Sequence, residues 1–403
     1  MKLFKAICMA TVVVLNVSTL AAVSAAESFT GALTSGKPYV DLRLRYETVD
    51  QNNALEDADA LTLRTKLGYA TDQYHGFSAT IELEDSRSVF GVDDYSLPPT
   101  GFKPGQFSVI ADPETTELDQ GFIQYKSSGF TGILGRQIIT LDSHRFVGHV
   151  GWRQDRQSFD GLTLKYQPND QWGLQISQLT KRNRIFAEDA DLDSNDTLIN
   201  ANYQTGLGKL TAYAYLLELD DVGSNSNDTF GVRFAGSTKA ANTKVSYVAE
   251  FATQEINDAI DTDYFAVEAG IQLAAINATL GIESLGSDNG NGAFATPLAT
   301  LHKFNGWADQ FLGTPVQGLD DIYLSLTGKL AKGKWSISYH DFSSDVSAAD
   351  GSDDLGDEID VVYSRNFGDH YYAGIKYADY SAGSTTFSKV DTEKLWLWGG
   401  VKF

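Results

Sequence analysis

Residues 39–47 have the sequence YVDLRLRYE, and this stretch decides the fold class. Every second residue from Val40 to Tyr46 is apolar, whereas every second residue from Asp41 to Glu47 is charged. Side chains alternate between the two faces of a β-strand, so the pattern predicts a strand with one apolar and one charged face. The charged face must contact water.

The same alternation recurs along the chain. It returns at 61–69, 77–84, 245–251 and 265–271, and in further runs up to the last residue. Counting the runs gives about eighteen strands, with sixteen as the alternative, each taking about 20 residues with its connection, which suits membrane strands of ~9–11 residues. The pattern therefore predicts an all-β transmembrane antiparallel β-barrel, with apolar residues facing lipid and charged residues facing a water-filled lumen.

The connections between the predicted strands alternate in length. Short turns are predicted at 72–76, 127–129, 167–171, 205–208, 239–242, 331–333 and 367–370. Long polar loops are predicted at 85–116, 139–158, 184–196, 220–228, 287–319 and 345–355. Outer-membrane barrels combine short periplasmic turns with long extracellular loops. A soluble β-sandwich would fit the composition but rarely sorts its connections in this way.

The N-terminus predicts a cleaved secretory signal peptide over 1–26. Two lysines precede an apolar run at 6–20, and small residues at 21–26 follow it. The run is shorter than the ~20 residues of a spanning helix, which argues against an uncleaved anchor. We expect the mature chain, 27–403, to form one barrel domain. The single cysteine, Cys8, lies in the leader, so we expect no disulfide in the mature protein.

The formal net charge is −22, which disfavours nucleic acid as a partner. Much of the acidic charge falls in predicted loops, such as 188–196 and 345–360. The sequence has no His-Glu-x-x-His motif, and the six histidines are scattered. We therefore expect no enzyme activity, no cofactor and no metal site. A hydrolase that uses a Ser and a His distant in sequence stays open as an alternative.

The last residues predict a closing strand. Leu395, Leu397, Val401 and the terminal Phe403 lie on one face of it. This end resembles that of outer-membrane barrels. The resemblance implies that Phe403 is a membrane-insertion signal read by the barrel-assembly machinery.

Three further stretches carry a family resemblance. The first runs from LGRQ at 134–137 to SFDG at 158–161; the second is LHKFNGWADQFL at 301–312 with GLDD at 318–321; the third is YHDF at 339–342 with LGDEID at 355–360. They resemble the alginate-export family of outer-membrane proteins, which implies an eighteen-stranded barrel. Many members look like general porins, and the expected inward face mixes acidic with basic residues, whereas an exporter of a polyuronate needs a cation-rich lumen.

Nine basic residues are candidates for lining and selecting in the lumen. Two consecutive predicted strands would form a basic ladder on one wall, and the segment 136–156 would form an anion-selective constriction if it folds inward. The alternative for that segment is bracing by ion pairs to Asp142, Asp155 and Asp160. The candidates are Arg43, Arg45, Arg64 and Lys66 in the ladder, Arg136, Arg145, Arg153 and Arg156 in the segment, and Lys165 on a later strand.

Within the predicted loop at 287–319, the segment 294–319 is unusually apolar for an outer loop. Phe304, Trp307 and Phe311, with Leu312, have the spacing of one face of a short helix. Such a segment would dip into the barrel as a constriction and present Trp307 to a sugar or another planar solute. Alternatively, it packs the loop against the rim.

The sequence as a whole predicts a channel in the outer membrane of a Gram-negative bacterium. It would let small hydrophilic solutes diffuse passively, with selection for anions or saccharides. The alternatives are an alginate-like polysaccharide exporter, an outer-membrane hydrolase and a non-conducting structural barrel. Expected partners are lipopolysaccharide and outer-membrane lipid, the barrel-assembly machinery and a small polar or anionic solute, and we expect a monomer.

Overall fold

The computed structural model describes residues 26–220, 225–241 and 243–403. The predicted signal peptide, apart from its last residue, and parts of the predicted connections at 220–228 and 239–242 lie outside the described residues. No helix in the described ranges is long and apolar enough to cross a membrane. The strands are β1 Lys37–Gln51, β2 Ala58–Ala70, β3 Phe77–Asp94, β4 Thr115–Ser127, β5 Phe130–Gln137, β6 Ser158–Tyr166, β7 Trp172–Asn183, β8 Leu192–Gln204, β9 Gly208–Glu218, β10 Ser226–Ala240, β11 Thr243–Ile256, β12 Ile260–Leu273, β13 Ile276–Leu285, β14 Leu319–Leu330, β15 Gly333–Ser343, β16 Asp354–Phe367, β17 Tyr371–Ala382 and β18 Thr392–Lys402.

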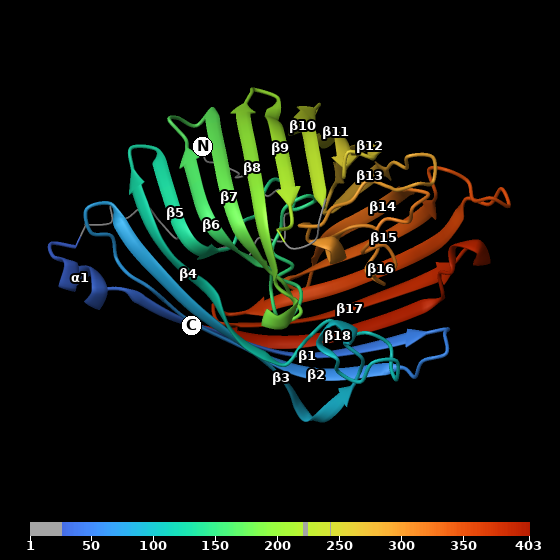
Figure 1. The fold of residues 1–403 in the computed structure, drawn as a ribbon, viewed down its shortest axis with the longest axis horizontal. Coiled ribbons are helices and arrows are strands. Elements are labelled where there is room, and N and C mark those ends of the chain that lie inside the picture. Colours follow the sequence, from blue (N-terminus) through green and yellow to red (C-terminus); the bar gives the residue numbers. More distant parts are fainter. Residues whose placement is uncertain (1–25, 221–224, 242) are drawn as a thin grey trace.

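The described strands form one closed antiparallel sheet of eighteen strands (Figure 1). Each strand pairs with the next along the chain. The sheet closes where β1 pairs with β18, from Asp41 opposite Lys402 to Gln51 opposite Thr392. Closure removes the sheet edges and leaves the ladder hydrogen bonds satisfied within the wall, as a membrane requires. The predicted barrel and its strand number are confirmed.

The two faces of the wall differ as the alternation predicted. Large apolar side chains point outward, such as Leu67, which is 51% exposed, and Leu134, which is 62% exposed. The intervening charged residues point inward, and many of them are buried, including Arg45 and Glu47. This arrangement is the reverse of a soluble protein and is typical of a wall that has lipid outside and polar groups inside.

The two ends of the barrel differ in their connections. At one end, the turn end, strands join through short segments; Ser128 and Gly129 between β4 and β5 both have positive φ, as a tight hairpin turn requires. Both termini of the barrel lie at this end, next to a helix α1 (Phe29–Thr34) that the sequence did not predict. The other end, the loop end, carries the segments 52–57, 95–114, 138–157, 184–191, 257–259, 286–318, 344–353 and 383–391.

Two predicted loop boundaries differ most from the structure. β3 extends to Asp94, beyond the predicted loop start at 85, and β8 begins at Leu192 inside the predicted acidic loop. Asp196 therefore lies on a strand, where its carboxylate is buried and accepts two hydrogen bonds from Arg182 of β7. An acidic residue can occupy a strand here because the strand's inner face supplies its cation.

Three of the loops, 95–114, 138–157 and 286–318, fold back against the inner wall (Figure 1). Phe294, Leu298 and Phe311 of loop 286–318 belong to one buried apolar cluster with inward aromatic residues such as Tyr264 and Trp396. The main apolar core of the protein thus lies inside the barrel, between loops and wall. It narrows the lumen.

The predicted short helix in loop 286–318 is wrong. Only residues Leu301–Lys303 form a single 3-10 turn, called η3. Asn305, Gly306 and Asp309 all have positive φ, which a right-handed helix does not accommodate. The aromatic spacing that suggested a helix comes instead from an irregular chain that repeatedly turns toward the wall.

Candidate constriction site in the barrel lumen

Loops 138–157 and 286–318 contact each other along their backbones. The amide of Gly148 donates to the Leu298 carbonyl at 2.8 Å, and the Gln157 side chain donates to the same carbonyl at 3.2 Å. Lys303 Nζ donates to the Ser143 carbonyl at 2.7 Å. These hydrogen bonds hold the two loops together, so they pack as one unit.

Arg43 and Arg45, the first two residues of the predicted basic ladder, bind this pair of loops to the wall. Arg43 on β1 donates from Nε to Gln154 Oε1 at 2.9 Å and from Nη2 to the Trp152 carbonyl at 2.9 Å. Arg45 forms ion pairs with Asp112 of loop 95–114 and, at 3.3 Å, with Glu47. Both side chains face inward as predicted, and both donate to the Trp152 carbonyl of loop 138–157.

Arg64 and Lys66, the other two ladder residues, face inward and pair with carboxylates on nearby strands of the wall. Arg64 on β2 contacts Asp41 on β1 at 3.1 Å. Lys66 on β2 contacts Asp119 on β4 at 3.1 Å and Glu84 on β3 at a still shorter distance. Three of the four ladder residues therefore form ion pairs, whereas Arg43 binds neutral loop atoms, and the selection of anions by the ladder stays a prediction.

Three of the four arginines predicted in the segment 136–156 lie in the lumen and bind acidic residues of distant strands. Their pairs reach β1, β3, β4, β13 and loop 286–318, so they fasten the loop at several points. Arg145 binds Glu283 at 2.7 Å, Arg153 binds Glu47 at 2.9 Å and Asp309 at 3.1 Å, and Arg156 binds Asp119 at 2.6 Å and also contacts Glu82.

The alternative partners weighed from the sequence are only partly right. Asp142 pairs with Lys209 at 2.7 Å and does not brace an arginine of its own loop. Asp155 is buried beside Glu117 and Glu84, and burial raises its pKa well above the ordinary value. Asp160 does pair with an arginine, but outside the lumen.

The fourth arginine, Arg136, does not lie in the lumen, so its predicted position is wrong. β5 continues to Gln137, so Arg136 lies on the same outward face as Leu134. Its guanidinium makes two hydrogen bonds to Asp160, at 2.8 and 3.0 Å, and the pair lines an outer-surface hollow with Leu134 and Leu162. Arg136 therefore does not line the pore, because strand alternation places its side chain on the outside.

Lys165 faces inward on β6, on the same face as buried Thr163, and its side chain is exposed. It lies near the turn end, away from the inward loops. As a cation exposed to the lumen, it differs from the buried ladder residues. Its part in selecting solutes stays a prediction.

The three predicted aromatic constriction residues all contact charged or aromatic groups inside the barrel. Arg145 lies over the Phe304 ring at 4.8 Å, and the Phe311 ring lies 4.6 Å from that of Phe342 on β15. The backbone amide of Trp307 donates to Glu358 on β16, and Lys376 on β17 lies 3.8 Å from the centre of the Trp307 ring. The loop thus enters the barrel rather than packing on its rim.

The sequence did not point to Lys376, Lys394 or His302 as site residues. His302 Nδ1 lies 2.6 Å from Asp309, and its Nε2 lies 2.7 Å from Lys376 Nζ. Because the Asp309 carboxylate accepts from Nδ1, that nitrogen carries the proton, and Nε2 accepts from the Lys376 amino group, as assigned from these partners. Burial lowers the pKa of His302 to about 3, so the ring is neutral at physiological pH. The inward parity of Lys376 and Lys394 on their strands is the sequence signal that could have found them.

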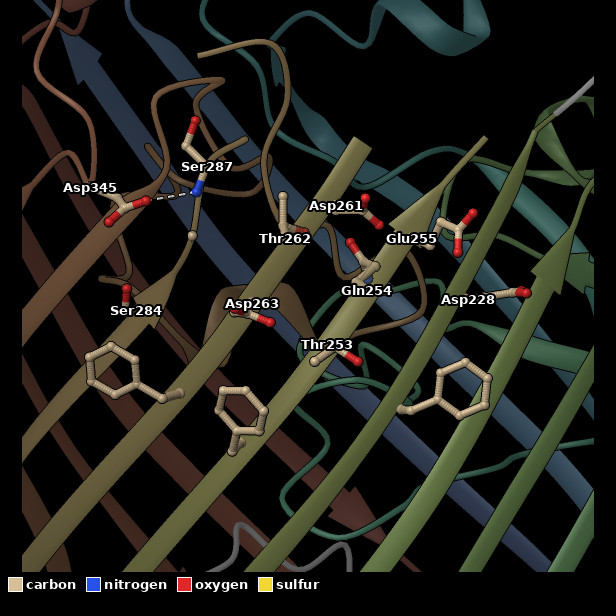
Figure 2. Close-up of a pocket in the computed structure, with 14 residues that line it drawn as sticks. Asp228, Thr253, Gln254, Glu255, Asp261, Thr262, Asp263, Ser284, Ser287 and Asp345 are labelled. Carbon is tan, nitrogen blue, oxygen red and sulfur yellow. Dashed lines mark hydrogen bonds between the residues drawn. The ribbon is translucent and has the colours of Figure 1, made fainter. Parts of the chain in front are cut away.

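A separate pocket lies at the loop end of β10–β13, outside the constriction (Figure 2). Asp228, Glu255 and Asp261 occupy directly opposed positions on three neighbouring strands. Exposed Phe251 and Phe265 lie on the same outward face. This acidic rim above aromatic residues suits the membrane interface rather than the lumen.

A closed antiparallel wall that is apolar outside and charged inside, with loops folded into its lumen, defines a transmembrane β-barrel of the outer-membrane class. Within this class, the chain belongs to the Alginate export family, whose model matches residues 39–283. No curated protein matches the chain in sequence.

Several solved structures share the fold. OccAB4 of Acinetobacter baumannii is 14% identical with a TM-score of 0.72, covering 91% of this chain and 98% of that one. OpdK of Pseudomonas aeruginosa, solved with vanillate, is 11% identical with a TM-score of 0.72, covering 92% of this chain and 99% of that one. OccK9 of Pseudomonas aeruginosa is 12% identical with a TM-score of 0.71, covering 92% and 100%. These identities support the shared barrel architecture alone.

Proposed function

We propose that the protein is an outer-membrane channel through which small hydrophilic solutes diffuse passively, selected where the inward loops narrow the lumen. The turn end would face the periplasm and the loop end the outside. The observation that carries the proposal is the fastening of loops 138–157 and 286–318 to the inner wall by ion pairs such as Arg153–Glu47 and Arg145–Glu283. A constriction needs rigid loops, and buried paired charges supply that rigidity.

The chemistry of the constriction favours solutes that carry a carboxylate on a planar body. Trp152, Trp307 and Trp398 are only partly buried, and they lie among arginines and lysines. Guanidinium and ammonium groups bind carboxylates, and indole rings stack on planar groups. OpdK, which shares the fold, was solved with vanillate, a benzene ring that carries a carboxylate. An aromatic carboxylate is thus the first solute to test.

Export of an alginate-like polyuronate is the second candidate, since the family match favours it. A polyanion needs a continuous row of cations along its path. In the described part of the lumen, ladder residues such as Arg64 and Lys66 are paired with carboxylates, which lowers their attraction for a long polyanion. Small anions need only one or two contacts, so we favour them.

Planar-bilayer recordings with the purified protein test the proposal. We expect stepwise conductance, a reversal potential that indicates anion preference, and partial block by vanillate at a lower concentration than by an oligouronate. Block by the oligouronate alone would favour the exporter. A silent, folded protein would contradict the channel and leave the structural barrel or the hydrolase.

Export and assembly complete the proposal. A cleaved leader and recognition of the C-terminal residue by the barrel-assembly machinery would bring the barrel to the outer membrane, where lipopolysaccharide surrounds it. The Phe403 ring is exposed, and its backbone pairs with Val40 at the junction of β1 and β18. Removing the ring by Phe403→Ala should therefore reduce the amount of assembled barrel in cells without changing conductance per channel. An unchanged amount would contradict the insertion signal.

A further inference from the structure

The ammonium group of Lys376 lies between two indole rings that come from different loops. Its Nζ is 3.8 Å from the centre of the Trp307 ring and 4.3 Å from the centre of the Trp152 ring. Trp152 belongs to loop 138–157 and Trp307 to loop 286–318, whereas Lys376 belongs to the wall strand β17. Ring faces attract a cation most strongly where water is excluded, and Lys376 is buried.

Trp152 and Trp307 form a cage around the Lys376 amino group, and His302 adds a hydrogen bond to it. Lys376 Nζ donates to His302 Nε2 at 2.7 Å, while the His302 ring lies nearly parallel to that of Trp152 at 5.1 Å. Asp309, which accepts from the other ring nitrogen, also contacts Lys394 on β18 at 2.9 Å. One lysine side chain therefore contacts both loops at once, through ring faces and through a hydrogen bond.

The cage lies where it would affect passage. Trp152 and Trp307 remain partly exposed although Lys376 and His302 are buried, so part of each tryptophan borders open space inside the barrel. Moving either ring would therefore change the space that the two loops leave open. An uncharged side chain of similar length would fill the same volume but could neither attract the ring faces nor donate to His302.

We infer that Lys376 is a positioning residue that latches the two inward loops to β17 and thereby sets the aperture that Trp152 and Trp307 border. The inference rests on the proposed channel function for its effect on conduction. The claim that Lys376 fixes the position of the two loops does not depend on conduction. The two parts can be tested separately.

The first test compares Lys376→Met with Lys376→Arg, which keeps the cation, and with Lys334→Met, an exposed inward lysine near the turn end of β15. We expect Lys376→Met to raise single-channel conductance at least about twofold with larger open-channel fluctuations, because the loops can move apart. Lys376→Arg and Lys334→Met should stay close to the wild type. Migration of unheated samples on a denaturing gel verifies that each barrel is folded.

The second test does not require conduction. Tryptophan fluorescence quenching by acrylamide should increase in folded Lys376→Met and stay at the wild-type value in the two controls. If the wild type is silent in bilayers, the channel proposal fails, and this measurement still decides on the latch. Unchanged quenching in Lys376→Met would overturn the latch, and increased quenching with unchanged conductance would overturn its role in setting the aperture.

A third pair of variants covers the case in which Lys376→Met does not fold. Trp152→Leu and Trp307→Leu each remove one ring face and leave the lysine in place. Each should raise conductance if the rings define the aperture. Wild-type conductance in both folded variants would overturn the inference.

Discussion

Arg136 and Arg153 come from one stretch of sequence and occupy opposite sides of the wall. Arg136 lies on β5 and pairs on the outer surface with Asp160, whereas Arg153 lies in a loop and pairs in the lumen with Glu47 and Asp309. Strand alternation sets the side of the first, and the inward path of the loop sets that of the second. The difference teaches that an arginine near a predicted constriction acts there only if its backbone has left the strand.

The sharpest way to break this comparison is Arg153→Ala, for which we expect the largest effect. The substitution removes the cation that Glu47 and Asp309 share, but Glu47 keeps Arg45 and Asp309 keeps Lys394, so the loss of stability should stay below the about 3–5 kcal/mol of a buried charge left without a partner. The loops should loosen, so single-channel conductance should rise and solute selection should weaken. Bilayer recordings and urea unfolding measure the two effects.

Arg153→Lys is the matched control, because it retains a cation but loses the two-pronged geometry. We expect an intermediate conductance and a smaller loss of stability. If Arg153→Ala keeps the conductance and stability of the wild type, the ion pairs do not hold the loops. The assignment of the constriction would then be wrong.

The next effect in size concerns charge selection. Arg45→Gln removes one inward positive charge and leaves Asp112 and Glu47 less compensated. The lumen becomes more negative, so the reversal potential in a salt gradient should shift toward weaker anion preference. Asp112→Asn is the opposite control: it removes a negative charge and should shift the reversal potential toward stronger anion preference. Equal reversal potentials in both variants would exclude this row of ion pairs from selection.

The sequence predicts the wall better than the lumen. Alternation places residues such as Leu67 and Arg45 on the correct faces, because the side-chain period of a strand is local. The partners of Arg145 and Arg153 lie on strands distant along the chain, and no local pattern specifies them. Lys376 shows the same limit: its inward position was predictable, but its two tryptophan neighbours depend on where two loops fold.

A smaller effect is expected from acid. Burial lowers the pKa of His302 and of His149 to about 3 in the folded loops, below the ordinary 6.5. A released loop would take up these protons at a higher pH, so the contribution of the two neutral histidines to loop packing is complete above about pH 6.5 and is lost as the pH falls toward 3. Protonation of these two rings should therefore raise conductance, with larger fluctuations, as the pH falls below about 6.

His149→Gln tests the origin of this pH dependence. His149 Nδ1 accepts a hydrogen bond from the Gly151 amide at 3.0 Å, and a glutamine oxygen can accept in its place without titrating. The variant should show a shallower pH dependence than the wild type. The same steepness in both would exclude His149 and leave His302 with Asp309 as the acid-sensitive contact.

Arg136→Ala should have the smallest effect, and it tests the other half of the comparison. The pair with Asp160 is partly exposed on the outer face, where such pairs contribute about 0–1 kcal/mol. Because the guanidinium lies on the far side of the wall from the lumen, neither conductance nor reversal potential should change. A shifted reversal potential would place Arg136 in the electric path of the pore, and the alternation that assigns every inward and outward residue would then fail at β5.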